Sequence, residues 1–309
     1  MFQGLVFSSA GTSIKYKFFK TLTGCLFIIK SDIFYILKNK KNGKFSKFFG
    51  FVMRGKTVCI ANQKGGVGKT TTAINLATSL ALLKKKTLIV DIDPQGNAGS
   101  GMGIEKDGEK NIYHALVLES SLDSIIKETE VPGLSFLSSN MDLTGAEIEL
   151  VNLPQREFRL RKSLEQVKDK FDYIFIDCPP SLGLLTINSL VAADSVLVPL
   201  QCEYYALEGL GQLLNTIKLV KAQLNPDLTL EGILLTMFDK RNRLSHQVAG
   251  DIMKHFETRV FEIIIPRNVR LAESPSYGLP VYFYDKQSVG AKAYVELAQQ
   301  FLIKQGENG

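Results

Sequence analysis

The chain has 309 residues, of which 45% are hydrophobic and none is tryptophan, which favours one globular domain or one domain with an extension. The net charge of +6 is unevenly spread, because residues 1–52 hold nine lysines and a single acid, Asp32. The other 257 residues carry a balance of −2, so a nucleic-acid role would need a local basic patch. The four cysteines lack C-x-x-C spacing, which excludes a readable disulfide framework or zinc site and favours a reducing cytoplasm.

Residues 1–52 form a basic extension rich in lysine and phenylalanine. Their apolar run, residues 21–29, is too short to span a bilayer, which needs about 20 residues. No A-x-A cleavage site follows, and the absence of arginine argues against a mitochondrial presequence. We expect the natural start at Met53, four residues before the first strand of the domain formed by residues 53–309. Membrane association of the extension is the alternative.

From residue 57 onward, apolar strands alternate with amphipathic helices. Predicted strands cover residues 57–62, 87–93, 134–139, 173–180, 195–201, 232–239 and 260–267, and predicted helices cover 69–85, 158–170 and 290–305. This alternation predicts an α/β fold with a mainly parallel twisted sheet and helices on both faces. Ligands in such sheets bind at the carboxyl ends of the strands.

The first strand runs into the glycine-rich stretch "NQKGGVGKTT" (62–71), which is typical of a phosphate-binding loop. Its glycines allow successive backbone N–H groups to turn toward phosphate oxygens, and the helix that follows presents its positive end. Lys69 is expected to reach the β- and γ-phosphates, and Thr70 to ligate Mg²⁺. The expected ATP-binding residues of the loop are Lys64, Gly65, Gly66, Val67, Gly68, Lys69, Thr70 and Thr71.

Acidic residues end two of the predicted strands. Asp177 follows a buried apolar run, where it is expected to hold a Mg²⁺ ligand water, the Walker-B role. Asp91 and Asp93 end the strand 87–93, and alternation places both on one face with Ile92 opposite. Asp93, at the tip, is the better candidate for positioning the attacking water, whereas Asp91 is expected to support either the Mg²⁺ shell or the loop.

With these motifs the chain resembles the ParA/Soj chromosome-partitioning ATPases of the deviant Walker-A class, a group of P-loop NTPases. The resemblance rests on "NQKGGVGKTTTAINLA", "LIVDIDPQGNA", "GAEIELV", "YIFIDCPPSLGLLTINSL", "QCEYYALEGLGQLL", "LLTMFDKR" and "IPRNVRLAESPSYGLPV", which together span residues 57 to about 302 in order. The extension has no counterpart in that pattern.

The resemblance implies a cytoplasmic, nucleoid-associated ATPase whose ATP-bound homodimer binds DNA without sequence preference. A ParB-type partner would stimulate its otherwise weak hydrolysis. It further implies that Lys64 reaches the partner subunit's phosphates and that Asp93 is needed for hydrolysis. The other roles it implies are an adenine pocket at Pro266 and Asn268, and DNA contacts from Arg241 and Arg270.

A second lysine in the loop also has a physical reading, because Lys64 and Lys69 would repel each other within one subunit. That repulsion favours a Lys64 side chain that extends out of its own loop into a neighbour's site, as an arginine finger does.

Two other functions remain open at this point. A MinD-like membrane switch that positions the division site would need a C-terminal amphipathic helix with a basic face, and residues 293–309, with one lysine and two glutamates, lack one. No membrane is therefore expected for the core. An electron-transfer ATPase similar to the nitrogenase iron protein would need two cysteines facing a shared cluster. Cys178 alone is near enough to the nucleotide.

Overall fold

The computed structural model describes residues 55–104 and 110–307 with their side chains, and it divides the chain into two units, Met1–Gly55 and Lys56–Gly309. Of the first unit it describes only the backbone of six strands. The strand β1 (Ser8–Ser9) pairs antiparallel with β2 (Thr12–Ser13). A four-stranded antiparallel sheet holds β3 (Tyr16–Lys20), β4 (Gly24–Ile29), β5 (Asp32–Lys38) and β6 (Phe45–Val52). The expected start at Met53 and the alternative of membrane association both concern residues whose side chains lie outside the described part of the chain.

The second unit is built on a seven-stranded sheet with the order β13-β12-β7-β11-β8-β10-β9. All neighbouring pairs are parallel except β9 with β10. The strands are β7 (Lys56–Ile60), β8 (Thr87–Asp91), β9 (Lys127–Glu128), β10 (Leu134–Leu137), β11 (Tyr173–Asp177), β12 (Ser195–Gln201) and β13 (Thr229–Thr236). Residues of β8 and β11 are buried throughout, as strands covered on both faces must be.

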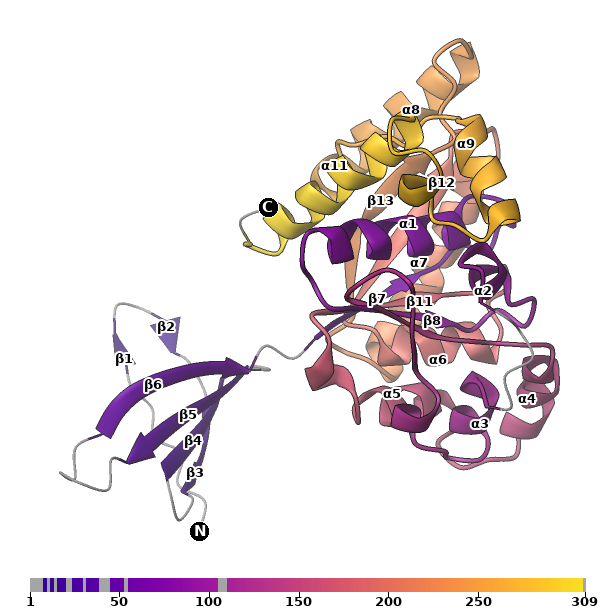
Figure 1. Ribbon diagram of the computed structural model, residues 1–309. Helices are drawn as coiled ribbons and strands as arrows, with labels where there is room; N and C mark the ends of the chain where they lie inside the picture. Colours follow the sequence, from indigo (N-terminus) through magenta and orange to yellow (C-terminus); the bar gives the residue numbers. More distant parts are fainter. Residues whose placement is uncertain are drawn as a thin grey trace. The chain divides into compact units, whose positions relative to one another are not determined.

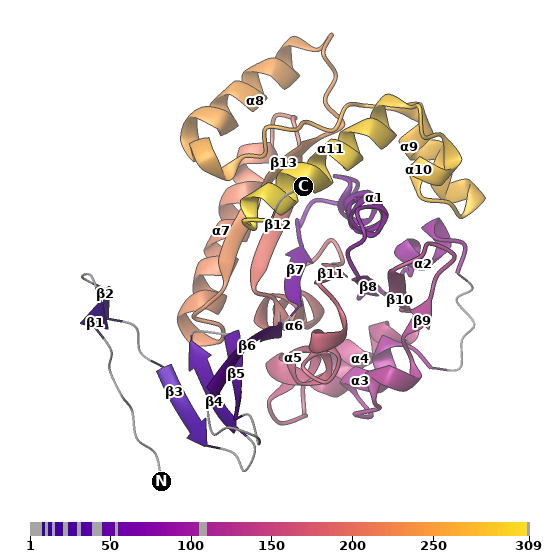
Figure 2. The same cartoon turned by 60° about the vertical axis from the view of Figure 1, so that its left-hand side comes forward.

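Helices cover both faces of this sheet, which confirms the predicted fold class (Figures 1 and 2). The helices α1 and α11 pack against each other on one face, and α5, α6 and α7 cover the other. The helices are α1 (Lys69–Leu82), α2 (Asn97–Gly101), α3 (Ile112–Leu116), α4 (Asp142–Leu150), α5 (Arg159–Leu164), α6 (Leu184–Ala192), α7 (Ala206–Gln223), α8 (Arg243–Phe256), α9 (Val269–Glu273), α10 (Val281–Tyr284) and α11 (Val289–Lys304). In the described part of the chain, no helix combines the length and apolarity needed to cross a membrane.

Two predicted elements differ from the structure. The apolar stretch 260–267 is not a strand, because it joins the sheet only through two isolated bridges, Ile233 to Val260 and Phe238 to Pro266. Its apolar side chains, such as Phe261 and Ile265, are buried against the α11 side of the sheet without a continuous ladder. The predicted helix 158–170 is broken after Leu164 and resumes as a 3-10 turn at Lys168–Lys170.

Candidate nucleotide-binding site

The loop between β7 and α1 lies at the carboxyl edge of the sheet and is shaped by two glycines. Gly66 and Gly68 have φ angles of 70° and 88°, which side chains with a Cβ rarely adopt. Gly68 is the N-cap of α1, so the first turn of that helix opens directly onto the loop. Its unpaired N–H groups and its dipole favour an anion at this position.

The loop is held by contacts with β12 and β13, which lie on one side of β7 in the sheet. The Asn62 side chain accepts a hydrogen bond from the Lys64 N–H (3.0 Å) and donates to the Pro199 carbonyl on β12 (2.8 Å). The Thr236 hydroxyl, at the end of β13, donates to the Val67 carbonyl (2.8 Å). These hydrogen bonds tie the loop to β12 and β13. Val67 contributes its backbone and packs into the core, where it is 1% exposed.

The two lysines of the loop have different environments. Lys69 is buried, and its ammonium donates to the Lys64 carbonyl (3.3 Å). Burial lowers the pKa of Lys69, and the negative charge of Asp177 offsets part of that effect. The Lys64 ammonium instead forms an ion pair with Glu203, outside the loop, and its side chain is 43% exposed. Lys64 thus extends away from its own phosphate loop.

A cleft of about 1270 Å³ opens in front of the loop. It is large enough for a nucleotide. Of the predicted ATP-binding residues, the cleft is lined by Gly65, Gly66, Gly68, Lys69, Thr70, Thr71, Pro266 and Asn268. Lys64 and Val67 are not among its lining residues. The structure thus brings the loop and the "PRN" segment, almost 200 residues apart in sequence, to one cavity.

The cleft wall around Pro266 is held by the end of β13. The backbone N–H of Phe238 donates to the Ile265 carbonyl (3.1 Å), and the Arg267 N–H donates to the Phe238 carbonyl (3.0 Å). Asn268 caps α9 through the Leu271 N–H (3.3 Å). The absence of a full strand at 260–267 leaves this segment free to curve into the cleft wall.

Asp177 ends β11 directly behind the loop. It is fully buried, and neither carboxylate oxygen has a partner within hydrogen-bonding distance. Burial and the nearby charge of Asp91 raise its pKa well above the usual range, while the nearby Thr70 hydroxyl, beyond hydrogen-bonding distance, and the positive charge of Lys69 offset part of the rise. A buried carboxylate with two open acceptor oxygens fits a site for a cation or its ligand water.

No group of three His, Cys, Asp or Glu side chains suited to a metal ion occurs within residues 55–104 and 110–307. A phosphate loop needs none, because Mg²⁺ takes a hydroxyl, phosphate oxygens and waters as ligands. Thr70, which lines the cleft, and Asp177 supply the hydroxyl and the outer carboxylate that such a site uses.

The two acids after β8 have separate surroundings. Asp91 is fully buried and accepts the N–H groups of Asp93 (3.0 Å) and Ala98 (3.1 Å). Burial raises the pKa of Asp91 to about 7. These contacts hold the segment that follows β8 and not the phosphate loop, so both roles expected for Asp91 stay predictions. Asp93 lines the cleft and accepts the Gln95 N–H (3.0 Å).

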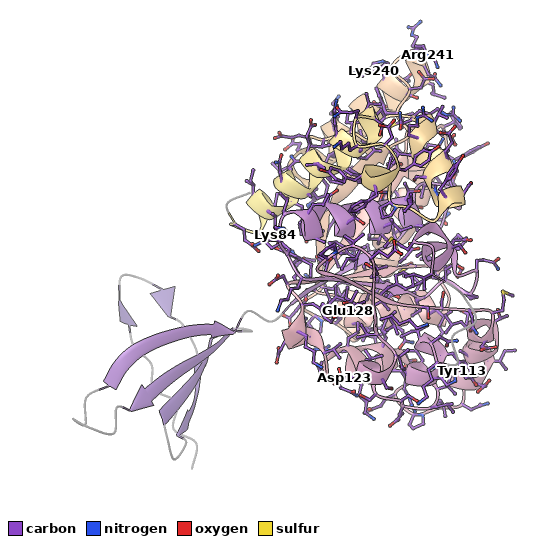
Figure 3. The ribbon with its side chains drawn as sticks, in the orientation of Figure 1. Lys84, Tyr113, Asp123, Glu128, Lys240 and Arg241 are labelled. Atoms are coloured by element: carbon purple, nitrogen blue, oxygen red, sulfur yellow. The ribbon has the colours of Figure 1, made fainter. Side chains whose placement is uncertain are left out.

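The two arginines proposed to contact DNA lie near the cleft and are both paired with carboxylates. Arg241 lines the cleft from the loop between β13 and α8, and Figure 3 shows it beside Lys240 at one end of the second unit. Its side chain is 90% exposed and binds Asp239 through two hydrogen bonds of 3.1 Å. Arg270, on α9, donates to Glu273 (2.9 Å) and lies 3.3 Å from Asp285.

Three contributors to the site were missed by the sequence reasoning. Asn62 and Thr236 fix the loop, and Arg267 lines the cleft. The signal for Arg267 was its place inside the "PRN" motif, between two residues that the prediction included. Asn62 and Thr236 lie in the quoted stretches "NQKGGVGKTT" and "LLTMFDKR", but neither pattern indicated that their side chains hold the loop, because each bonds to a distant segment that only the fold brings near.

A strand, a glycine loop and a helix with a buried lysine, beside an acid that ends a neighbouring strand, define a P-loop nucleoside triphosphatase. A family model described as an AAA domain matches residues 55–230. The chromosome partitioning protein ParA of Myxococcus xanthus DK1622 is 57% identical over 254 residues, which are 82% of this chain and 90% of that protein. The sporulation initiation inhibitor protein Soj of Bacillus subtilis 168 is 56% identical over 80% of this chain and 98% of that protein. The chain belongs to the ParA/Soj family of chromosome-partitioning ATPases.

Solved structures agree on the fold and the cofactors. A cobyrinic acid a,c-diamide synthase of Mycobacterium smegmatis, bound to an ATP analogue and magnesium, is 36% identical with a TM-score of 0.71, over 82% of this chain and 98% of that one. A plasmid partition protein of Borrelia burgdorferi B31 bound to AMPPNP is 29% identical with a TM-score of 0.69, over 81% of this chain and 99% of that one. Both of these structures thus hold an ATP analogue, and the first also holds magnesium. The different activities in these names show that one fold serves several functions.

Proposed function

We propose that this ATPase is a dimerising, DNA-binding switch that works with a ParB-type partner. ATP drives the formation of a homodimer, and the dimer binds DNA without sequence preference at the nucleoid. The partner stimulates hydrolysis and so releases the ATPase from DNA. The activity resides in residues 53–309, and the cargo is a chromosome or a plasmid.

The observation that carries this proposal is the direction of the Lys64 side chain. Lys64 lies in the phosphate loop but extends away from it to an exposed position. The side chains of Tyr204 and Tyr205 beside its partner Glu203 are also exposed, at 75% and 68%. Exposed aromatic side chains next to a charged residue are typical of a protein interface. A second copy docked on this face would receive Lys64 at its triphosphate.

Hydrolysis then uses groups from both subunits. Lys69 and the N–H groups of the loop hold the phosphates, and Thr70 with Asp177 would hold Mg²⁺, which neutralises charge on the phosphates. Asp93, at the cleft wall, orients the attacking water. Lys64 of the second subunit stabilises the charge that develops in the transition state, so hydrolysis requires the dimer.

DNA binding is assigned to the cations at the cleft mouth. Lys240, Arg241 and Arg243 follow one another closely, and all three are exposed. Arg270 lies on α9, whose N-cap is the cleft-lining residue Asn268. Such a patch suits phosphate contacts, which carry affinity without sequence information.

The alternatives find less support. The C-terminal helix α11 is packed into the core along α1, with Tyr294, Leu297 and Phe301 buried, so it offers no apolar face for a membrane. An electron-transfer role needs Cys178 at a dimer surface, yet its side chain is 1% exposed and faces Cys59 of the same subunit (Sγ–Sγ 3.3 Å).

The test is DNA binding by the protein with ATP, with ADP and without nucleotide. Tight binding with ATP alone, equal for unrelated DNA sequences and weakened by salt, is the expected result. Equal binding in all three states would refute the switch. Recruitment to anionic lipid vesicles instead of DNA would support the MinD-like alternative.

A further inference from the structure

Within residues 55–104 and 110–307, the exposed carboxylate of Glu203 pairs with one side chain, that of Lys64. Glu203 lies between β12, which ends at Gln201, and α7, which begins at Ala206. Its side chain is 48% exposed and forms an ion pair with the Lys64 ammonium. Within the described residues, the carboxylate has no second hydrogen-bond partner. In the part of the subunit that the structure describes, Lys64 is therefore the group that its charge holds.

This pair places the two possible anionic partners of Lys64 in competition. In the single subunit the Lys64 ammonium forms an ion pair with Glu203. In an ATP-bound dimer it would instead contact the phosphates bound to the partner subunit, and the ion pair with Glu203 must break first. We propose that Glu203 is a positioning residue that retains Lys64 within its own subunit until a triphosphate on a second copy displaces it. This inference rests on the proposed function, because it takes Lys64 to act in the dimer.

Charge and solvation explain why such a competition responds to the nucleotide. An ion pair between two half-exposed side chains is weak, since water screens both charges. A triphosphate carries more negative charge than one carboxylate, and a closing interface excludes water, which strengthens the new contact. ADP lacks the γ-phosphate and competes less well. The ion pair with Glu203 therefore opposes dimerisation, and a bound ATP overcomes it whereas a bound ADP does not.

The expected size of the effect follows from the strength of exposed pairs. Each subunit breaks one pair on dimerisation, so two pairs are lost per dimer. Because exposed ion pairs contribute little free energy each, a variant that lacks the pair in both subunits should have a dimer dissociation constant lower by about 2- to 30-fold.

Structural support of the β12–α7 turn is the competing explanation for Glu203. The backbone of that turn is held by its own hydrogen bonds, from the Glu203 N–H to the Gln201 carbonyl (2.9 Å) and from the Ala206 N–H to the Glu203 carbonyl (3.0 Å). The glutamine variant keeps these contacts and the side-chain volume. It removes only the charge.

The experiment compares dimerisation of the full chain by sedimentation velocity, with AMPPNP and Mg²⁺, with ADP and without nucleotide. The variants are Glu203→Gln, Lys64→Ala and the double variant. Glu165→Gln is the matched control, because it removes one exposed carboxylate from an ion pair with Arg161 (3.6 Å; 51% and 44% exposed) on α5. Should Glu203→Gln fold poorly, Glu203→Ser replaces it.

Glu203→Gln is expected to dimerise at lower concentration with AMPPNP, by the factor given above, and Glu165→Gln to match the parent. The double variant should equal Lys64→Ala, since Glu203 acts only through Lys64. Unchanged or weaker dimerisation of Glu203→Gln, with Lys64→Ala still impaired, overturns the inference and leaves the proposed function standing. Normal dimerisation of Lys64→Ala overturns both.

Discussion

At the scale of single residues, Lys69 has the environment that a phosphate ligand requires. It is buried beside Asp177 and faces the cleft, so its charge is available to a bound triphosphate with little competition from water. We expect Lys69→Ala to lower the affinity for ATP by about 10- to 100-fold, because the variant loses a hydrogen bond to a charged group. Calorimetric titration with ATP and Mg²⁺ measures this. Lys218→Ala, on the exposed side of α7, is the control, and near-normal affinity of Lys69→Ala would contradict the site.

Asp93 should separate binding from hydrolysis. Its carboxylate lines the cleft and accepts the Gln95 N–H, but it belongs to the loop after β8 and not to the phosphate loop. We expect Asp93→Ala and Asp93→Asn to bind ATP, to hydrolyse it poorly and to accumulate as dimers. The asparagine variant retains an acceptor for Gln95, so a defect shared by both variants is chemical. Size-exclusion chromatography and phosphate release are the measurements; unchanged turnover in either variant argues against this role.

Local patterns predicted the part of the site that consecutive residues build. The glycines and Lys69 share one loop, and Asp177 ends a recognisable strand, so both could be read from the sequence. The Lys64–Glu203 pair could not, because it joins residues 139 positions apart that meet only when β7 and β12 pair side by side. The same limit hid Thr236.

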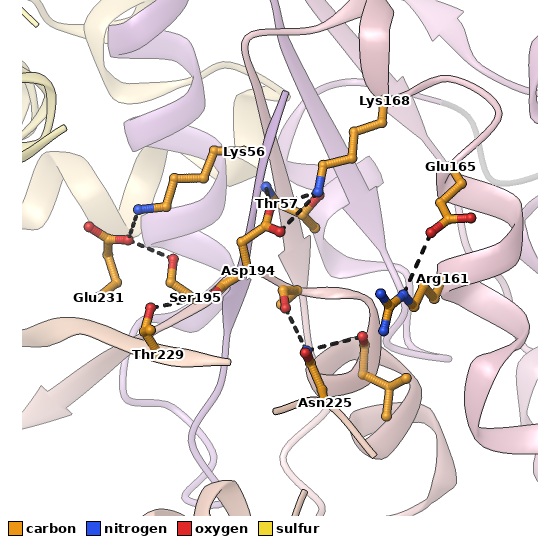
Figure 4. A network of polar contacts seen from close by, with 12 residues as sticks. Lys56, Thr57, Arg161, Glu165, Lys168, Asp194, Ser195, Asn225, Thr229 and Glu231 are labelled. Carbon is orange, nitrogen blue, oxygen red and sulfur yellow. Dashed lines mark hydrogen bonds and ion pairs between the residues drawn. The ribbon is translucent and has the colours of Figure 1, made fainter. Parts of the chain in front are cut away.

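At the scale of elements, a buried polar cluster joins three strands and the last helix at the amino edge of the sheet. Figure 4 shows Lys56 of β7 and Ser195 of β12 directed at Glu231 of β13. The Glu231 carboxylate lies 2.5 Å from the Lys56 ammonium, accepts the Ser195 hydroxyl (2.6 Å) and accepts the Gln305 amide (2.8 Å). Both oxygens of the carboxylate are thus engaged, and these contacts tie the starts of the three strands to one another.

Removal of the Glu231 charge should destabilise the fold in a pH-dependent way. Burial alone would raise its pKa, but the ammonium of Lys56 and the hydrogen bonds hold it below the usual range. A lowered folded-state pKa contributes stability above the unfolded value of about 4.3 and loses it as pH falls through the folded value. We expect Glu231→Gln to cost about 1–3 kcal/mol at pH 7, and the cost to shrink below about pH 4.3. Urea unfolding across this range tests it, with Glu165→Gln as control; a pH-independent difference would contradict the charge argument.

Most strands could be predicted because hydrophobic runs between polar helices mark them. The stretch 260–267 carries the same apolar signal, yet its side chains fill the α11 side of the sheet from an irregular segment that pairs at Val260 and Pro266 only. The apolar signal indicates burial both for the strands and for residues 260–267, and the two differ in the backbone hydrogen bonds, which form a continuous ladder only in the strands. The short edge strand β9, Lys127–Glu128, is exposed and polar, so no apolar pattern indicated it.

At the scale of the whole molecule, DNA binding should depend on charge at the cleft mouth. We expect Arg241→Ala and Arg270→Ala to weaken DNA binding for every sequence and to reduce its salt dependence, because each loses phosphate contacts. ATP affinity should remain. Filter binding at several salt concentrations measures both effects, and Arg161→Ala, exposed on α5, serves as control. DNA binding equal to the parent in both variants would place the patch elsewhere.

The position of Lys64 can be tested by mixing two inactive proteins. Lys64→Ala lacks the lysine that is proposed to act on the partner, and Asp93→Ala lacks the acid of its own site. In a mixed dimer, the site on the Lys64→Ala subunit keeps its own Asp93 and receives Lys64 from the Asp93→Ala subunit. The other site lacks both groups. We therefore expect the mixture to regain up to half of the parent's activity per mixed dimer, measured as phosphate release with saturating ATP.

The control titrates each variant into itself, and co-purification of differently tagged subunits verifies that mixed dimers form. If mixed dimers form and remain inactive, Lys64 acts within its own subunit, because a lysine acting in cis would leave each of the two sites without one essential group.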